Sequence, residues 1–186
     1  MSFFEQLVKQ SNTDEWYTQA KDVQIIVPYL SQNEYRKILC PFDTRESNFV
    51  KVLRNNGFDV SYSCITTGVD FFEIDNLSDY DAIVSNPPFS KRQRVLERLF
   101  NANVPFAMIM NFNGLFDNRI RYELFKSHKF EILVPRDRMN FFNETCNGGC
   151  PNFQSVYVCS KILPNQIVFD GDCCKGGRNE RQKFNS

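Results

Sequence analysis

The sequence predicts an α/β fold: a Rossmann-like arrangement with a mostly parallel central sheet and helices on both faces. Short apolar runs alternate with segments of helical periodicity, and turn-forming residues separate them. The last two apolar runs are joined by a turn-rich segment rather than by a helix. We therefore also expect an antiparallel strand pair at the C-terminal end of the sheet.

The expected strands differ in pattern. Residues 81–86 form a continuous apolar run that is typical of a buried strand, whereas 59–64 alternates between apolar and polar residues. By these patterns we expect strands at 37–42, 59–64, 81–86, 104–112, 130–136 and 153–163.

Helices are expected at 46–57, 90–102 and 116–128. Gly57 is a plausible C-terminal stop for the first helix, and Ser90 is a possible N-cap for the second. The apolar stripe of the third helix is predicted to run through Phe116, Ile120 and Leu124.

Composition indicates a globular chain. The sequence has 186 residues, of which 42% are hydrophobic and 24% charged, and no apolar run approaches the ~18 residues that span a bilayer. We expect a single domain over 1–169, a disordered tail over 170–186, no membrane association and a cytoplasmic location. Net charge is zero, so any nucleic-acid contact requires a local basic patch, such as the one that begins at Lys91 and Arg92.

The seven cysteines do not form a convincing metal site. Cys146, Cys150, Cys173 and Cys174 could supply four thiolates, but neither pair has the Cys-x-x-Cys spacing that zinc sites prefer. We therefore predict no metal.

The stretch Asn86-Pro87-Pro88-Phe89 follows the apolar run at 81–86 and carries the most specific chemistry. Methylation of an exocyclic amine on a base requires two fixed acceptors for the amine protons, since the nitrogen lone pair is delocalised into the ring. The Asn86 side chain supplies one carbonyl and the backbone of Pro87 supplies another, which Pro88 holds rigid. The Phe89 ring offers a flat face on which a flipped base can stack.

This motif resembles motif IV of the S-adenosylmethionine-dependent amino methyltransferases, which most often methylate adenine N6 in DNA. The segments "DEWYT" (14–18), "ILCPFDTRESNFVKVL" (38–53) and "VDFFEI" (69–74) are similar to those of EcoRI-type and phage-encoded adenine methylases. The resemblance covers about residues 14 to 160. It implies a methyltransferase domain, a restriction-modification or phage setting, and S-adenosylmethionine as the cofactor.

The resemblance also implies a role for each matching residue. Asn86 and Pro87 would hold the target amine, with Asn86 bordering the cofactor as well, and Phe141 or Phe142 would help Phe89 to hold the base. DNA would be the partner, with Lys91 and Arg92 beside its backbone. The residues expected around the cofactor are Tyr17, Thr18, Pro41, Phe42, Asp43, Ser47, Asp70 and Phe71.

Two departures from the family pattern leave alternatives open. No Gly-x-Gly loop follows the first strand, so Asp43 and Ser47 are expected to contact the cofactor instead, and no acidic residue ends the second strand. Little sequence is left for a recognition domain, which a homodimer or a partner subunit could supply. The substrate could also be an RNA base or a protein glutamine, or the fold could be a non-catalytic module that binds nucleic acid or a partner.

Overall fold

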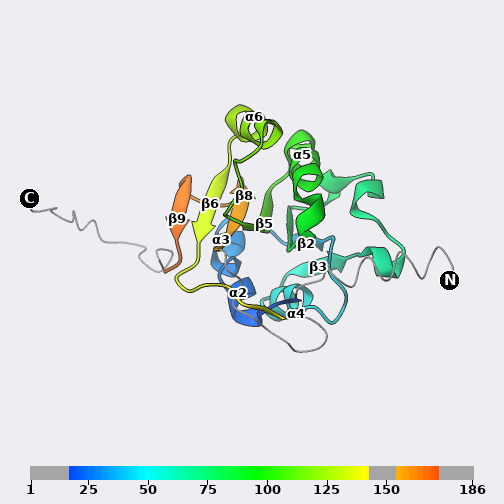
Figure 1. Ribbon diagram of the computed structural model, residues 1–186. Helices are drawn as coiled ribbons and strands as arrows, with labels where there is room; N and C mark the ends of the chain where they lie inside the picture. Colours follow the sequence, from blue (N-terminus) through cyan, green and yellow to red (C-terminus); the bar gives the residue numbers. More distant parts are fainter. Residues whose placement is uncertain (1–16, 143–153, 172–186) are drawn as a thin grey trace, which may run out of the picture.

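A seven-stranded sheet forms the centre of the protein, whose computed structural model describes residues 17–142 and 154–171, with only the main chain of Phe142 (Figure 1). The strand order is β3-β2-β4-β5-β8-β6-β9, and β1 and β7 form a separate two-stranded sheet. The strands are β1 (Tyr17–Thr18), β2 (Lys37–Cys40), β3 (Asp59–Tyr62), β4 (Ala82–Ser85), β5 (Phe106–Asn111), β6 (Glu131–Val134), β7 (Phe141–Phe142), β8 (Ser155–Ser160) and β9 (Ile167–Phe169). The helices are α2 (Ala20–Gln24), α3 (Val27–Gln32), α4 (Asn48–Asn55), α5 (Arg92–Ala102) and α6 (Arg119–Ser127), with 3-10 turns η1 (Ile65–Thr67), η2 (Phe71–Glu73), η3 (Leu77–Asp79) and η4 (Phe89–Lys91).

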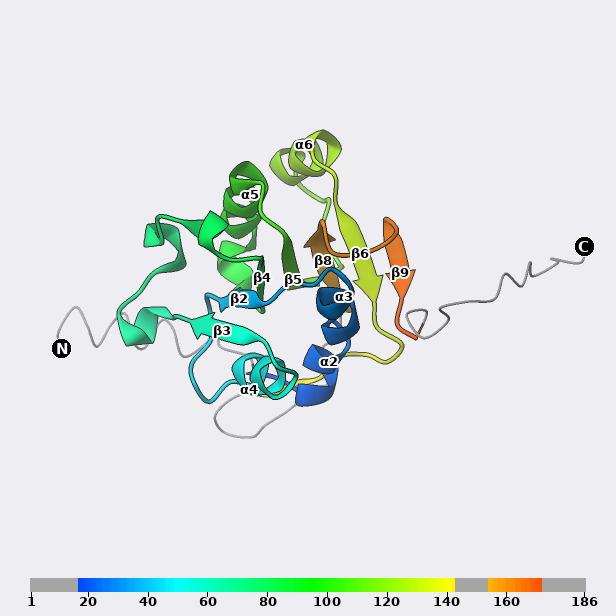
Figure 2. The same cartoon turned by 180° about the vertical axis from the view of Figure 1, so that it is seen from behind.

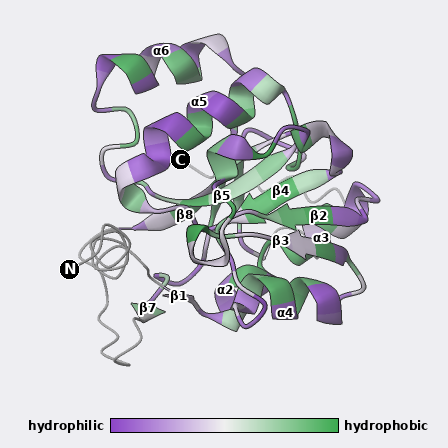
Figure 3. Cartoon of the chain, turned by 90° about the vertical axis from the view of Figure 1, so that its right-hand side faces the viewer, coloured by the Kyte–Doolittle hydropathy of each residue, from purple (hydrophilic) through white to green (hydrophobic). Residues whose placement is uncertain are grey.

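Helices cover both faces of this sheet, which makes three layers. Figures 1 and 3 show α5 and α6 on one face and α2, α3 and α4 on the other. Successive strand residues enter different cores: Ile38 and Cys40 pack into the core beneath α2–α4, while Leu39 between them packs into the core beneath α5. Because a strand alternates its side chains, a strand buried on both faces is expected to be mostly apolar, and β4 is apolar up to its last residue, Ser85.

The pairing of the strands confirms the predicted fold class. β3, β2, β4 and β5 run parallel to one another, and β8 lies antiparallel between β5 and β6. From β2 the chain moves outward to β3 and then crosses to β4 on the other side of β2. The carboxyl ends of β2 and β4 therefore border the point where strand order reverses, which is where ligands bind in open α/β sheets.

Elements without a strong sequence pattern complete the fold. α2, α3 and β9 lie outside the expected ranges, and Figure 2 shows α2 beside α4, α3 next to α2, and β9 at the edge next to β6. The connection from β3 to β4 is built from η1, η2 and η3. Arg98 of α5 anchors this connection, because its guanidinium donates to the Ile74 carbonyl and lies 5.3 Å from the centre of the Phe71 ring.

The predicted apolar stripe of α6 is wrong. Ile120 is 57% exposed, and the helix instead buries Phe125 and the charged Arg121. The Arg121 guanidinium can be buried because it donates hydrogen bonds to the carbonyls of Leu115 and Gly114, at 3.1 and 2.8 Å. A buried cation with backbone acceptors leaves no trace in apolar periodicity.

Two predicted helix boundaries had different outcomes. Gly57 follows the end of α4 with φ of 86°, the left-handed geometry of a helix stop, as predicted. Ser90 is not the N-cap of α5, because it lies inside the turn η4, and Lys91 occupies the N-cap position without a side-chain hydrogen bond to the helix. Among the described residues, none of the helices combines the length and apolar character needed to cross a membrane.

Candidate functional site

The carboxyl ends of β2 and β4 bring the chemistry-bearing residues together. β4 ends at Ser85, and the chain continues directly into Asn86, Pro87 and Phe89. Pro87 is buried, whereas Asn86 and Phe89 are half-buried. Pro88 has φ of −54° and ψ of 131°, which turns the chain out of the strand and into η4. The motif is therefore a rigid exit at the rim of the sheet.

Asp43, in the loop after β2, lies beneath this exit. Its two carboxylate oxygens accept from the hydroxyls of Ser47, at 2.6 Å, and Ser85, at 2.5 Å. Burial raises the pKa of Asp43 from 3.8 to about 6, and the two hydroxyl donors limit that rise. The Asp43 amide also donates to the Ser63 carbonyl at 3.1 Å, which ties the loop to the end of β3.

Thr18 connects the N-terminal segment to the same exit. Its hydroxyl accepts from the side-chain amide of Asn86 at 3.2 Å, and its carbonyl accepts from the side-chain amide of Asn48 at 2.7 Å. Thr18 is only 5% exposed. The tertiary structure thus joins the first motif of the sequence to the Asn86 amide and fixes the orientation of that amide.

Two phenylalanines meet beside the motif. The rings of Phe89 and Phe141 lie 6.5 Å apart at 83°, an edge-to-face contact. Phe141 is there because β7 pairs with β1, which places Thr18 opposite Phe141 and Tyr17 opposite Phe142. The side chain of Phe142 lies outside the described residues.

The residues expected around the cofactor occupy the neighbouring region. Pro41 is buried in the β2 exit, and the next ring, Phe42, packs 5.1 Å from Phe71. Phe71 is 1% exposed, so of these two rings only the half-buried Phe42 offers a face to a ligand. Asp70 caps η2 by accepting from the Phe72 amide at 3.1 Å. One oxygen of Asp70 is therefore engaged by the backbone, and Phe42 is the ring of this pair that stays partly open.

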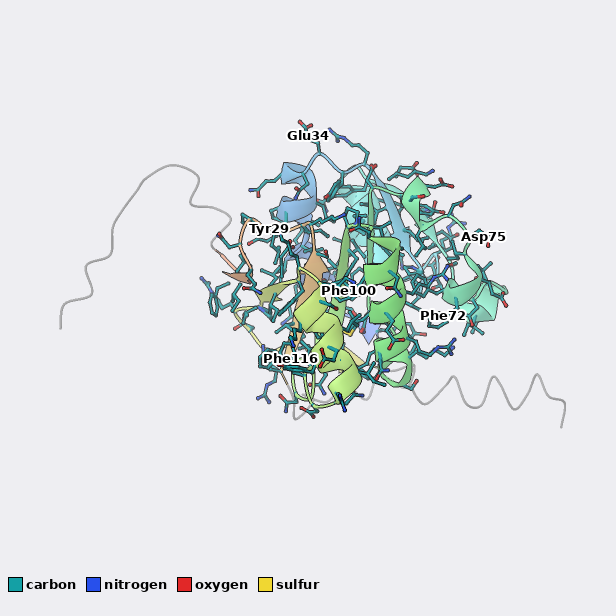
Figure 4. All side chains as sticks on the ribbon, turned by 90° about the horizontal axis from the view of Figure 1, so that it is seen from above. Tyr29, Glu34, Phe72, Asp75, Phe100 and Phe116 are labelled. Atoms are coloured by element: carbon teal, nitrogen blue, oxygen red, sulfur yellow. The ribbon has the colours of Figure 1, made fainter. Side chains whose placement is uncertain are left out.

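The basic residues that follow the motif, Lys91, Arg92 and Arg94, lie beside an aromatic ring and beside the loop after β5. Lys91 and Arg94 lie 5.9 and 4.4 Å from the centre of the Phe72 ring, whose position beside α5 is labelled in Figure 4. Arg92 points to the loop after β5, where an added Cβ on Gly114 would lie 3.6 Å from its Nη2 atom. This side of the site is therefore cationic and borders the loop before α6.

Sequence reasoning missed Ser85 and Asn48. Ser85 is fully buried at the end of an apolar strand, and a hydroxyl in such a run is the only signal that could have indicated it. Asn48 begins α4, and the sequence alone indicates only a surface helix residue there, without its contact with Thr18.

Within residues 17–142 and 154–171, no group of three or more His, Cys, Asp or Glu side chains could hold a metal ion. Cys146, Cys150, Cys173 and Cys174 lie outside the described residues.

No protein-family model and no curated protein matches this sequence. Among solved structures, the chain is similar to the methyltransferase subunit of a type I restriction-modification system from Streptococcus thermophilus, with a TM-score of 0.47 and 13% identity. The match covers 89% of this chain and 50% of that subunit, so this chain spans about half of its length. At this level of similarity we base the function on the geometry of the site.

Proposed function

We propose that the protein transfers a methyl group from S-adenosylmethionine to the N6 amino group of adenine in DNA, on a base flipped out of the duplex. The observation that carries this proposal is the placement of Asn86 at the carboxyl end of β4, with its amide oriented by Thr18. An exocyclic amine needs acceptors in a fixed position, and this side chain is held in one.

The residues of the Asn86-Pro87-Pro88-Phe89 motif have different roles in this reaction. The carbonyls of Asn86 and Pro87 accept the two protons of the amine, which directs the nitrogen lone pair out of the plane of the base. Bound S-adenosylmethionine supplies an electrophilic methyl group, whose bond to sulfur breaks as the bond to nitrogen forms. The amine then loses one proton to solvent, so the chain needs no covalent intermediate.

The half-buried Phe89 ring supplies the platform for the base, and Phe141, which is 2% exposed, supports that ring from the side. Their edge-to-face contact holds the Phe89 ring in place, and stacking on an aromatic ring contributes about 1–3 kcal/mol per base. That stabilisation offsets part of the few kcal/mol needed to unstack a base from a duplex. Arg92 and Lys91, which follow on the same side, are suited to a phosphate backbone.

The test measures transfer of labelled methyl groups from S-adenosylmethionine to unmethylated duplex DNA, followed by nucleoside analysis for N6-methyladenine. Asn86→Ala is expected to lower the rate by roughly a hundredfold or more, the scale of losing one positioned hydrogen-bonding group in a transition state. Its affinity for S-adenosylmethionine, measured by calorimetry, should stay within about threefold of the original protein.

A matched control is Asn56→Ala, which removes the same side chain from the end of α4, where it donates to the Val52 carbonyl at 2.8 Å. This variant should retain transfer. If the label appears on RNA or on a protein glutamine instead of DNA, the proposed methyl transfer stands but the proposed substrate is wrong. No label on any of the three, at saturating cofactor, would reject the enzyme and favour a non-catalytic binding module.

A further inference from the structure

The strongest unassigned feature is a closed ring of contacts around Asp43. Asp43 accepts from Ser85, which is covalently followed by Asn86, and Asn86 donates to Thr18. Thr18 accepts from Asn48, which is covalently preceded by Ser47, and Ser47 donates to Asp43. Two peptide bonds and four hydrogen bonds therefore close a loop through β1, the exit of β2, the start of α4 and the exit of β4.

Within this ring both oxygens of Asp43 are engaged by hydroxyls, and the residue is 8% exposed. A group so enclosed is poorly placed to meet a cofactor directly. It is well placed to set the geometry of the strand exit, because Ser85 is the residue immediately before Asn86.

We propose that Asp43 is a positioning residue that holds the Asn86 amide in its working orientation, through Ser85 on one side and through Ser47, Asn48 and Thr18 on the other. This inference rests on the proposed function for its role in methyl transfer. It replaces the expectation that Asp43 and Ser47 contact the cofactor in place of a glycine loop.

The chemistry of the side chain explains why an aspartate is needed. A carboxylate accepts from two hydroxyl donors at once, whereas an asparagine of the same shape offers one acceptor and one donor. Asp43→Asn therefore keeps the volume of the side chain but forces one hydroxyl to turn. The rotated hydroxyl breaks one of the two connections, or arms, that link Asp43 to Asn86: the arm through Ser85 or the arm through Ser47, Asn48 and Thr18. The other arm remains.

The main test separates turnover from cofactor binding. Asp43→Asn is expected to lower kcat for methyl transfer by about 10- to 100-fold, while KM and Kd for S-adenosylmethionine change by less than about threefold. Ser85→Ala, which removes one arm only, should lower kcat by about three- to tenfold. A tenfold or greater loss of cofactor affinity in Asp43→Asn with unchanged kcat would make Asp43 a cofactor ligand and overturn the proposal.

The matched control is Asp81→Asn, at the opposite end of the same strands. The Asp81 carboxylate accepts from the amides of Arg36 and Lys37, both at 2.8 Å, and so also bridges β4 to β2. If bridging these strands were all that mattered, the two variants would lose turnover equally. We expect the control to keep kcat within about twofold.

A double variant tests whether the two arms act through the same group. Asp43→Asn combined with Thr18→Val should lose little more than the worse single variant, because both changes release the same Asn86 amide. Asp43→Asn combined with Phe89→Ala should instead show multiplied losses. If the losses of kcat from Asp43→Asn and Thr18→Val also multiplied, the two residues would act independently, and the ring would have no shared function.

An activity-independent measurement keeps the proposal testable if Asp43→Asn folds poorly or if no substrate is methylated. The side-chain amide signals of Asn86, assigned by their loss in Asn86→Ala, should exchange slowly with solvent in the original protein. Exchange should be at least severalfold faster in Ser85→Ala and unchanged in Asp81→Asn. Equal exchange in all three would overturn the positioning role, whereas a chain that methylates nothing but shows this difference would overturn only the proposed function.

Discussion

The two ends of the β2–β4 strand pair each carry an aspartate bridge, but the bridges are built in opposite ways. At the amino end, exposed Asp81 accepts two backbone amides, and these hydrogen bonds lower its pKa below 3.8. At the carboxyl end, buried Asp43 accepts two hydroxyls, and burial raises its pKa to about 6.

The difference separates stability from function. A carboxylate whose pKa falls on folding contributes to stability near neutral pH, whereas one whose pKa rises makes the ionised folded state less stable. The amino end of the pair therefore stabilises the sheet. The carboxyl end instead holds a buried carboxylate at a cost to stability, and a carboxyl group with such a raised pKa is typical of functional sites.

The largest expected effect concerns the aromatic rings at the two ends. Phe89→Ala should lower methyl transfer by about 10- to 100-fold, because it removes a stacking contribution of about 1–3 kcal/mol. The measurement is the initial rate on duplex DNA, with a thermal melt to verify folding. Tyr80→Ala, at the amino end, removes a ring that lies 5.1 Å from the Lys37 ammonium and should leave the rate unchanged. Equal losses from both would remove the functional distinction between the ends.

The next effect is on stability as a function of pH. Because the pKa of Asp43 is about 6 in the folded chain and its ordinary value is 3.8, the folded state binds more protons than the unfolded state between these values. Lowering the pH from 7 to 5 should therefore raise its contribution to the free energy of unfolding by about 1 kcal/mol. Buried Asp22, whose pKa burial also raises to about 6, acts in the same direction.

Urea unfolding of three proteins at pH 5 and pH 7 resolves this contribution. In Asp43→Asn the gain in stability from pH 7 to pH 5 should be smaller than in the original protein by about 1 kcal/mol, while the part due to Asp22 remains. Asp81→Asn should be less stable at both pH values by roughly 1 kcal/mol, with an unchanged difference between them, because Asp81 loses its contribution only as pH falls below about 3.8. A pH response that is the same in Asp43→Asn as in the original protein would mean that this carboxyl does not titrate in that range.

The smallest effect compares two glycines in left-handed conformations. Gly57 precedes β3 with φ of 86° and has no atom within 4 Å of an added Cβ, so Gly57→Ala costs only the backbone strain of about 1–2 kcal/mol. Gly114 follows β5 with φ of 74°, and its Cβ would lie 2.6 Å from the Asp117 carboxylate. Gly114→Ala should cost a few tenths of a kcal/mol more, measured by denaturant unfolding. A smaller cost than that of Gly57→Ala would show that Asp117 moves without penalty.

Apolar periodicity predicted β2 to β6, β8 and the helices α4 and α5 well, because those elements are buried on one or both faces, but it missed β1, β7 and β9. It failed for α6, where Arg121 is buried through backbone acceptors and Ile120 is exposed. It also missed α2 and α3, which are five and six residues long and too short for a helical period to repeat. Phe116 and Phe100, labelled in Figure 4, pack 5.0 and 5.9 Å from Phe125 in a cluster that only the fold assembles.

The order of the main strands and helices, the mostly parallel character of the sheet and the rigid exit at Asn86-Pro87-Pro88-Phe89 follow from the sequence, because they depend on local periodicity and on the covalent geometry of proline. The partners of that exit do not. Thr18 lies 68 residues from Asn86 and Asp43 lies 42 residues from Ser85, and only the packing of β2 against β4 and of β1 against β7 brings them together. A carboxylate reads the same in sequence whether it meets a ligand or two serine hydroxyls, since its role is decided by the neighbours that tertiary structure places within hydrogen-bonding distance.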